Sequence, residues 1–582
     1  MTNLKWWLGW LAVLGLGIWL RFWQLGDVPV GTYWDETAIL LDAKSLAETG
    51  KDIHGLPGSQ SIFPSYGDYK LPVYIWLATA SVKVFGASQW AMRLPSAIVG
   101  VLTIILAAGL IRELTKDLKV SKFLELITGL VVAISPWSLQ FSRTAFEGHL
   151  GQFFLGVSIW CWLKGKSRPA WRWLSGLIGA IGVYCYYSVR FVWPVVLLAL
   201  LGVEIFQTWQ EKQQQKTQKI NFKQIFSQIF SWGLIPIIIF SLALLPLANS
   251  NFSTEADRFR LSTDSVLNQK DWAIQSNKLR DLAGNQFWTR IFYHRHWLMA
   301  RELALNYADN LSWEFMFLTG DPNLRHGTGR VGLFYWWALP GLIAGAYWWA
   351  SKKLPVLIVL ICWWLIALLP ASVPETTPHA LRSLNALLPL VLIISAGCYF
   401  ILTAVWEFLS QLATKFKPVA KLVFWLLLTL VLVWPLATYL ADYYGDYKLR
   451  SVTAWQGGYS QLADKILEIN QSNSTTWIQT NDVRFYLWLM LAADKKSLPL
   501  TPQTEAGFIF TQLGPYQINQ VNWLEIVYSQ KPMLLVMMTQ DLNREIQERK
   551  LEPEWVITNQ TFSTQTSYSI AGFRWPEEDP LP

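Results

Sequence analysis

The sequence contains a series of apolar stretches, each close to the roughly 20 residues that a helix needs to cross a bilayer. The composition agrees, since 52% of the residues are hydrophobic, 15% are charged and 35 are tryptophans, which is too apolar for an ordinary soluble enzyme. The chain is therefore predicted to be an integral membrane protein. The predicted spans are 6–22, 92–111, 123–138, 149–163, 173–187, 191–207, 229–247, 332–350, 355–370, 382–405 and 422–440.

Lysines and arginines gather in short clusters between these stretches. The net charge is +8, but the clusters do not line one face, so nucleic-acid binding is not indicated. Positively charged loops tend to stay on the cytoplasmic side of a membrane. A chain that starts inside and crosses eleven times places every cluster on that side and its C-terminus outside. The clusters are 112–122, 164–172, 212–223, 352–353 and 415–421.

Two segments are expected to lie at the membrane interface without crossing. Counting 71–86 as a further span would invert the side of every later loop, and about 16 residues is short for a span. Segment 291–307 mixes apolar and charged residues at helical spacing. Both are predicted to be interfacial helices. The first apolar stretch lacks a small-residue cleavage site, so it is expected to be retained.

Residues 441–582 alternate strand-like and helix-like runs, a pattern typical of a small α/β domain. The segment has no nucleophile elbow, phosphate loop or dinucleotide fingerprint. We therefore expect a multi-span membrane domain of residues 1–440 and an extracytoplasmic α/β domain of residues 441–582. The strand-like runs are 476–479, 507–510 and 533–538, and the helix-like runs are 459–469, 482–492 and 540–550.

A pair of carboxylates, Asp35 and Glu36, follows the first predicted span. At the boundary between water and lipid, such a pair can serve as a general base, a metal ligand or an acceptor for a sugar hydroxyl. The alternative is a helix start, because acidic residues in a first turn interact favourably with the helix dipole. The local pattern leaves both alternatives open.

Asp68 and Lys70 lie two residues apart, just before the segment 71–86. A carboxylate and an amine at this spacing can hold a phosphate or a metal ion. Alternatively, Lys70 stands at the end of an apolar helix and simply extends its ammonium to the lipid headgroups.

A second polar group precedes the predicted span 149–163. Arg143 and Glu147 are four residues apart, so on a helix they would share a face and could pair with each other, which at a surface contributes well under about 1 kcal/mol. Ionisable residues at the end of an apolar span nevertheless favour a functional role. We expect one for Arg143 and Glu147, with His149 beside them.

Two later loops carry further candidates. His379 and Arg382 are three residues apart before the span 382–405, so both can face one site, and a planar guanidinium suits a phosphate. The alternative is an interfacial anchor. Arg325 and His326 belong to a polar, glycine-rich stretch that could order over a ligand or be only a turn.

Together these motifs resemble the membrane-embedded GT-C-type glycosyltransferases, in particular the lipid-carrier-dependent family that includes protein O-mannosyltransferases and the lipid A aminoarabinose transferase. The resemblance covers roughly residues 5–190 by motif and the later spans by layout. Leu71 stands where the family often has proline, and Glu147 stands where aspartate is frequent. The residues that carry the resemblance are Arg21, Leu25, Pro29, Gly31, Asp35, Glu36, Lys70, Leu71, Pro72, Phe85, Gly86, Arg93, Leu94, Pro95, Ser96, Ser142, Arg143 and Glu147.

The resemblance implies an inverting glycosyltransferase that moves a sugar from a polyprenyl phosphate carrier to an acceptor hydroxyl on the outer membrane face. It implies that Asp35 acts at the acceptor or as the catalytic base and that Glu147 is a second acidic catalytic position. Lys70 and Arg382 match groups that grip the carrier phosphate. Asp68 lies where relatives can hold a metal-binding carboxylate, so a divalent metal ion is an implied cofactor.

The implied partners are the polyprenyl phosphate sugar donor, membrane lipid, and a glycan, lipid or protein acceptor. The expected location is a bacterial inner (plasma) membrane. The chemistry suits such a boundary, because the carrier tail needs lipid, its phosphate needs a cation at the interface, and the sugar carbon must meet a hydroxyl in water.

A transporter or flippase of lipid-linked or anionic substrates is the main alternative, because it would also use boundary arginines and lysines. Transporters usually place polar residues in the middle of the membrane, whereas the predicted spans here are nearly free of internal charge. This pattern favours chemistry at one surface. A receptor or assembly subunit is a third possibility, but anchoring alone would not need eleven spans.

Overall fold

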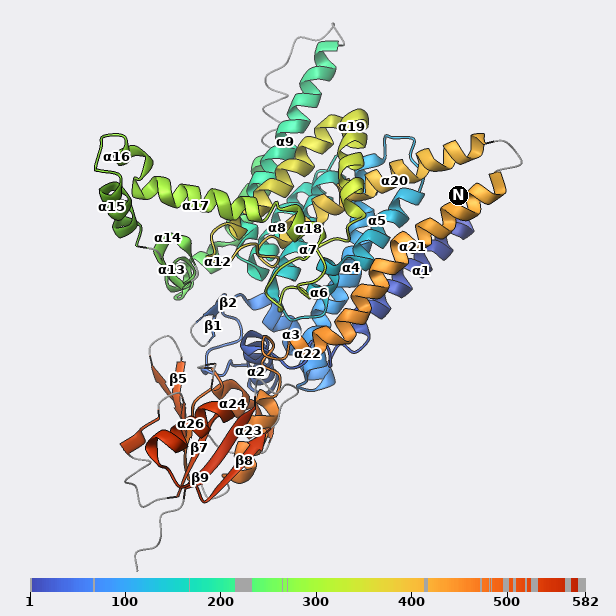
Figure 1. Ribbon diagram of the computed structural model, residues 1–582. Coiled ribbons are helices and arrows are strands. Elements are labelled where there is room, and N and C mark those ends of the chain that lie inside the picture. The colour runs from blue at the N-terminus through green and yellow to red at the C-terminus, as the bar shows by residue number, and fades with distance from the viewer. Residues whose placement is uncertain are drawn as a thin grey trace, which may run out of the picture. The chain divides into compact units, whose positions relative to one another are not determined.

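The structure is a computed structural model, and its helices and strands are labelled in Figure 1. It describes residues 3–65, 68–166, 168–214, 233–263, 265–269, 271–412, 417–470, 474–480, 482, 484–495, 502–505, 509–518, 521–524, 532–559 and 567–573. Most of the positive cluster 212–223, the start of the predicted span 229–247 and the start of the predicted strand 507–510 lie outside these residues.

The chain divides into two compact units, and each is described by itself. The helical unit comprises residues 1–25, 71–74 and 93–442, and the sheet unit comprises residues 26–70, 75–92 and 443–582. The predicted division into domains 1–440 and 441–582 stays a prediction.

A helix lies at each predicted span. They are α1 (Asn3–Phe22), α4 (Gln89–Thr115), α5 (Phe123–Ile134), α6 (Pro136–Ser142), α7 (Glu147–Lys164), α8 (Ala170–Cys185), α9 (Val189–Gln214), α11 (Ile235–Ala243), α12 (Leu245–Ala248), α19 (Ala338–Leu368), α20 (Leu387–Gln411) and α21 (Lys417–Tyr444). The predicted fold class, a helical multi-pass membrane protein with a small C-terminal α/β region, is confirmed.

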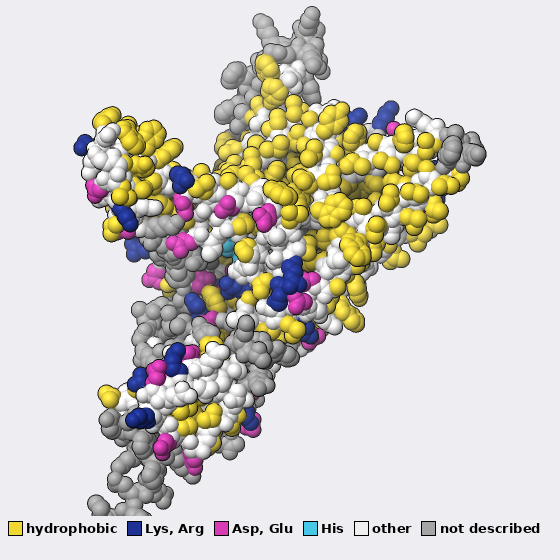
Figure 2. All heavy atoms as spheres, in the orientation of Figure 1, with side chains coloured by type: hydrophobic (Ala, Val, Ile, Leu, Met, Phe, Trp, Pro, Cys, Tyr) yellow, Lys and Arg dark blue, Asp and Glu magenta, His cyan; other side chains and the backbone are white. Residues whose placement is uncertain are grey.

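Within the described part of the chain, five helices are long and apolar enough to cross a membrane, and six if the pair α5 and α6, bent by 59°, is one span. The remaining predicted spans coincide with shorter or less apolar helices, so the count of eleven crossings stays a prediction. On α21, side chains such as Leu426 and Trp434 are exposed. Figure 2 shows hydrophobic side chains over much of the visible surface of the helical unit. Exposed apolar surface of this extent is suited to lipid.

Helices α19 and α20 approach each other at glycines. A Cβ atom built on Gly397 would lie 1.9 Å from the carbonyl oxygen of Gly341, and one built on Gly345 would lie 1.8 Å from that of Ile393. Such contacts between small residues are a common packing device of membrane helices. Helix α19 is kinked at Lys353, two residues before Pro355, because proline disrupts the preceding turn. The two arms of this helix are the predicted spans 332–350 and 355–370.

The two segments expected at the interface are also helical. They form α3 (Pro72–Phe85) and α17 (Arg295–Asp309). Helix α3 is a short apolar helix, as the sequence indicates. Their place at the interface stays a prediction. The other helices between α12 and α19 are α13 (Ser253–Thr263), α14 (Val266–Gln269), α15 (Trp272–Leu282), α16 (Thr289–Phe292) and α18 (Trp313–Phe317).

The sheet unit contains a seven-stranded mixed sheet in the order β4-β5-β6-β3-β7-β9-β8. The central strand β3 (Thr475–Ile478) pairs in parallel with β6 (Tyr516–Ile518) and β7 (Met533–Met538). The antiparallel outer strands are β4 (Pro502–Glu505), β5 (Ile509–Leu513), β8 (Trp555–Asn559) and β9 (Tyr568–Phe573). The helices of this region are α22 (Asp446–Arg450), α23 (Tyr459–Ile469), α24 (Tyr486–Lys495) and α26 (Thr539–Arg549).

The core of this sheet forms as the sequence predicts. Strand β7 is a continuous apolar run, and buried Leu535 and Met537 pack with Trp477 of β3 and Leu542 of α26. Runs that are apolar without alternation suit strands covered on both faces. The predicted α/β alternation is confirmed. The segment that follows α1 adds α2 (Trp34–Thr49) and the short hairpin of β1 (Phe63–Pro64) and β2 (Tyr69–Lys70) to the same unit.

Candidate functional site

Asp35 lies in the first turn of α2 with both carboxylate oxygens engaged. The hydroxyl of Tyr33, the residue at the helix N-cap, donates a 2.7 Å hydrogen bond to Oδ2. The ammonium of Lys70 donates to Oδ1. The Asp35 side chain keeps 20% of its surface exposed, whereas that of Lys70 keeps only 2%. The carboxylate is therefore fixed in orientation and still accessible.

Lys70 stands between two carboxylates. Strand β2 brings it to Asp35, and its Nζ is also 3.8 Å from Oδ2 of Asp68. The same ammonium lies 5.2 Å from the ring centre of Trp34. The structure thus unites Asp35, Asp68 and Lys70 in one cluster. If Lys70 binds a phosphate, it does so as part of an ion pair that is already formed.

Residues of the C-terminal region hold the residue next to Asp35. The side-chain oxygen of Gln456 accepts a 2.7 Å hydrogen bond from the backbone N–H of Trp34. The same amide donates to the carboxylate of Asp482, and the guanidinium carbon of Arg484 lies 3.9 Å from the Trp34 ring centre. Sequence reasoning missed these residues, because no local pattern links positions so far apart. The sequence signal for these contacts was limited to one tryptophan, Trp34, next to the candidate base Asp35.

Gly31 allows the close approach of these two segments. Its φ of +84° is a conformation that other residues rarely adopt. A Cβ atom at this position would lie 2.8 Å from the Cα atom of Gly457 and 2.9 Å from the carbonyl oxygen of Trp455. Glycine is therefore needed here for both its conformation and its size.

Glu36 differs from Asp35 in its surroundings, because its side chain is completely buried. A second buried carboxylate, Asp42, lies two turns further along α2 and was not anticipated from the sequence. Its Oδ1 receives a long 3.5 Å contact from the N–H of Ile53, and its Oδ2 has no hydrogen-bond partner among the described residues. Burial and the nearby Asp52 raise the pKa of Asp42 well above its usual value.

In the helical unit, Arg143 and Glu147 do not share a helix. Arg143 ends α6, and Glu147 begins α7 after the extended residue Phe146. Their four-residue separation therefore does not place them on one helical face, because the chain turns between them. Arg143 is 1% exposed and donates to the carbonyl oxygens of Leu20 and Arg21, at 2.8 and 3.2 Å.

These contacts give Arg143 a structural task. A cation at the C-terminus of a helix satisfies its last carbonyls and interacts favourably with its dipole, and α1 ends at this point. The third contact is 3.1 Å to the carbonyl oxygen of Gln24. A role of Arg143 in phosphate binding, like that of Glu147 in catalysis, stays a prediction. His149, in the first turn of α7, is fully buried.

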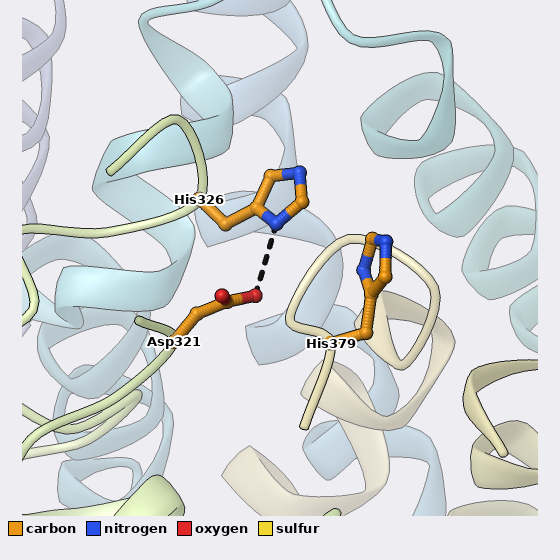
Figure 3. A group of neighbouring side chains, drawn as sticks. All are labelled: Asp321, His326 and His379. Carbon is orange, nitrogen blue, oxygen red and sulfur yellow. Dashed lines mark hydrogen bonds and ion pairs between the residues drawn. The ribbon is translucent and has the colours of Figure 1, made fainter. Parts of the chain in front are cut away.

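Two later loops of the helical unit meet at Asp321, as Figure 3 shows. Its Oδ2 lies 2.9 Å from Nδ1 of His326 and accepts a 2.7 Å hydrogen bond from the N–H of Ala380. The imidazoles of His326 and His379 lie side by side, with ring centres 4.6 Å apart. Asp321 and His326 are buried, and His379 is partly exposed.

Two arginines flank these histidines. Arg325 bonds through Nε to the side-chain oxygen of Asn323, and the N–H of Arg382 makes a 3.4 Å contact with Nδ1 of His379. Burial of its imidazole, together with the electrostatic effect of His326, Arg382 and Arg325, lowers the pKa of His379 well below its usual value. The imidazole of His379 is therefore neutral at physiological pH. The structure brings His326, His379 and Asp321 together, and sequence reasoning had not singled out Asp321.

Among the described residues, Asp321, His326 and His379 form the group of three side chains whose ligand atoms are close enough for a metal ion. Asp68, the position expected from the sequence to bind a metal, is not a member. Its Oδ1 accepts a 2.7 Å hydrogen bond from the N–H of Tyr69, and its Oδ2 faces Lys70. A metal at Asp68 stays a prediction.

Comparison with known families supports the sequence-based resemblance. The family model described as dolichyl-phosphate-mannose-protein mannosyltransferase matches residues 69–220, a segment that includes Lys70, Arg143 and Glu147. The resemblance to lipid-carrier-dependent glycosyltransferases is confirmed. No curated protein matches the sequence.

Several solved structures are similar to the chain. The oligosaccharyltransferase of Archaeoglobus fulgidus shares 13% identity at a TM-score of 0.49, over 84% of this chain and 64% of that protein. This chain thus spans less than two thirds of that enzyme. ArnT from Cupriavidus metallidurans, solved with undecaprenyl phosphate, shares 12% identity at a TM-score of 0.47, over 97% and 98% of the two chains. The O-mannosyltransferase complex Pmt1-Pmt2 of S. cerevisiae shares 16% identity at a TM-score of 0.32, over 43% and 34%.

Proposed function

We propose that this chain, which resembles the GT-C-type lipid-carrier-dependent glycosyltransferases, transfers a sugar from a polyprenyl phosphate carrier to an acceptor hydroxyl at the outer face of the membrane, with inversion at the anomeric carbon. The family match over residues 69–220 supports the class of reaction. The observation that carries the proposal is the accessible carboxylate of Asp35, fixed by Lys70 and Tyr33.

Asp35 is the general base of this proposal. The acceptor oxygen attacks the anomeric carbon as the bond from that carbon to the phosphate oxygen breaks, and the hydroxyl proton passes to the carboxylate. The bonding electrons leave with the carrier phosphate. The Asp35 side chain keeps 20% of its surface exposed, so an acceptor hydroxyl can approach it. Positioned acid–base groups typically contribute about 10²–10⁴ in rate.

Lys70 and Tyr33 are proposed to orient this base. Their bonds to different oxygens of one carboxylate restrict its rotation, which reduces the entropy lost when the acceptor aligns. Lys70 also neutralises part of the negative charge of Asp35 and Asp68. The assignment of Arg382 to the carrier phosphate remains a proposal from the sequence resemblance, and that of His379 a proposal from its spacing to Arg382.

The proposal is tested with purified full-length chain in lipid nanodiscs. Candidate polyprenyl phosphate sugars are supplied with glycan, lipid or peptide acceptors, and release of the free polyprenyl phosphate is followed by mass spectrometry. Carrier release that depends on an acceptor is expected for a transferase. Movement of intact lipid-linked sugar between leaflets, without release of the carrier, would instead establish the flippase alternative.

A matched pair of variants separates catalysis from folding. Asp35→Asn is expected to abolish transfer while retaining insertion. Asp541→Asn makes the same chemical change at an exposed ion pair with Arg544 and is expected to keep full activity. Full transfer by Asp35→Asn would refute the assignment of the base.

A further inference from the structure

We propose that Asp321, His326 and His379 form a binding site for a divalent transition-metal ion of the Zn²⁺ type. This proposal concerns the helical unit and does not rest on the proposed glycosyl transfer. It differs from the expected site at Asp68, because no residue of that cluster takes part. Two loops that follow different helices supply the ligands, one before α19 and the other before α20.

The donor atoms suit such an ion. One ligand atom from each of the three side chains lies within 4.8 Å of the others. Donors around a tetrahedral zinc at about 2.1 Å are roughly 3.4 Å apart, so binding requires a contraction of at most about 1.4 Å. Two imidazoles and one carboxylate form a set that zinc uses with a fourth position open for water or substrate. Hard cations such as Mg²⁺ prefer oxygen ligands.

The surrounding contacts fix the ligands in place before any ion arrives. Oδ1 of Asp321 accepts a 2.8 Å hydrogen bond from the N–H of Asn323, and Oδ2 accepts from Ala380. The backbone N–H of His379 donates a 3.0 Å hydrogen bond to the side-chain oxygen of Asn310. Outer contacts of this kind orient metal ligands and contribute to affinity. In Figure 3 the ring of His379 stands opposite that of His326.

A hydrogen-bonded pair without a metal is the competing explanation. In that explanation, Asp321 pairs with His326 of the same loop and accepts a hydrogen bond from the N–H of Ala380 in the other loop. The two loops are then joined without an ion. This explanation accounts for two of the three side chains. It gives no task to the ring of His379, whose centre lies 4.6 Å from that of His326 and whose Nδ1 lies 3.4 Å from the backbone nitrogen of Arg382. A metal ion uses all three residues.

Nearby positive charges limit the affinity of the proposed site for a metal ion. Arg325 and Arg382 act on His379 electrostatically and oppose an incoming cation, while Asp321 supplies one negative charge. An anionic ligand at the open fourth position would offset the arginines. We therefore expect a site that exchanges its metal with solution and is not permanently closed.

The test uses full-length chain with an affinity tag that contains no histidine, stripped with a chelator and titrated with Co²⁺ and Zn²⁺. The chain has six histidines, so few competing sites exist. Calorimetry is expected to show about one ion per chain, and Co²⁺ to develop the strong visible absorption of a four-coordinate site. Loss of one ligand in His379→Ala or His326→Ala is expected to weaken binding at least tenfold, the lower end of what second-shell changes cause.

His294 and His296 provide the matched control. Both are exposed, with ring centres 5.1 Å apart, and could themselves attract a metal. The double variant His294→Ala/His296→Ala is expected to bind like the parent chain. Loss of binding in that variant would refute the proposed site, as would the absence of stoichiometric binding in the parent chain.

The proposal can be tested even if one of the ligand variants does not fold. If His326→Ala does not fold, His379→Gln replaces it, because glutamine keeps most of the volume and the pair of Asp321 and His326 remains. Undiminished Co²⁺ absorption in His379→Gln would overturn the proposal.

Discussion

The guanidinium of Arg484 lies 3.9 Å from the centre of the Trp34 ring, directly beside the residue that precedes Asp35 in the chain. Lys70 approaches the same ring, at 5.2 Å. Gln456 holds the backbone N–H of Trp34. The C-terminal region therefore contributes directly to the position of the residue beside the candidate base.

Arg484 is expected to act as a positioning residue. Arg484→Ala should lower kcat by about fivefold to thirtyfold, because a partly desolvated cation over an indole contributes roughly 1–2 kcal/mol. Arg484→Lys should restore part of the activity. KM for the carrier should change little, which separates positioning from carrier binding, and steady-state kinetics checks both quantities.

Arg549 supplies the control for this prediction. Its guanidinium lies 4.2 Å from the ring centre of Trp523, a similar contact elsewhere in the sheet unit. Arg549→Ala should leave kcat unchanged. Equal losses in the two variants would mean that Arg484 serves only the stability of the sheet unit.

Lys70→Met is expected to reduce transfer by at least tenfold. The change removes the ammonium that bonds to Asp35 and leaves an apolar side chain of similar length in a buried position. The pH dependence of kcat should also change, because the base loses its charged partner. The measurement is a pH–rate profile of parent and variant. An unaltered profile and rate would show that the ion pair has no part in the reaction.

Asp42→Asn is expected to stabilise the protein at neutral pH. The raised pKa of Asp42 in the folded chain means that the folded state holds this proton at pH values where the unfolded chain has lost it. Stability therefore falls as pH rises from the usual carboxyl pKa through the raised one. Asparagine carries no titratable carboxyl, so the variant avoids this loss of folding stability. For a poorly satisfied buried group the loss is about 1–3 kcal/mol.

Thermal unfolding in detergent at several pH values tests this expectation. The Tm difference between Asp42→Asn and the parent should shrink towards acidic pH, where both states are protonated. Asp541→Asn, at an exposed position, should show no such trend. A variant that is less stable at neutral pH would indicate that the Asp42 carboxylate has a stabilising partner in solution.

Gly397→Ala is expected to destabilise the helical unit by more than about 1 kcal/mol, because its Cβ would lie 1.9 Å from the Gly341 carbonyl oxygen and α19 and α20 would have to separate. Gly15→Ala, also in a helix, places its Cβ in open space and should be neutral or slightly stabilising. The Tm in detergent distinguishes the two. Similar Tm values for the two variants would mean that α20 can shift with little loss of stability.

The sequence predicted those parts of the fold that depend on local pattern. Apolar length indicated the helices of the helical unit, and the helix-like and strand-like runs predicted α23 and strand β7 at the residues where they occur. The kink in α19 lies at the positive cluster 352–353, between the two predicted spans 332–350 and 355–370.

The contacts between distant segments could not be predicted in this way. No spacing rule connects Trp34 with Arg484, or Asp321 with Ala380, since each pair is brought together by folding of the chain between them. Proximity of Asp35 and Lys70 was suggested only by their shared loop. Arg143 and Glu147 do not share a helix, because the chain turns between them where helical spacing was assumed.

The bond from Trp34 to Gln456 joins positions 422 residues apart. During synthesis, the segment that carries Asp35 leaves the ribosome long before its partner exists. Trp34, the residue that precedes the candidate base, can therefore form this bond only after most of the polypeptide has been made.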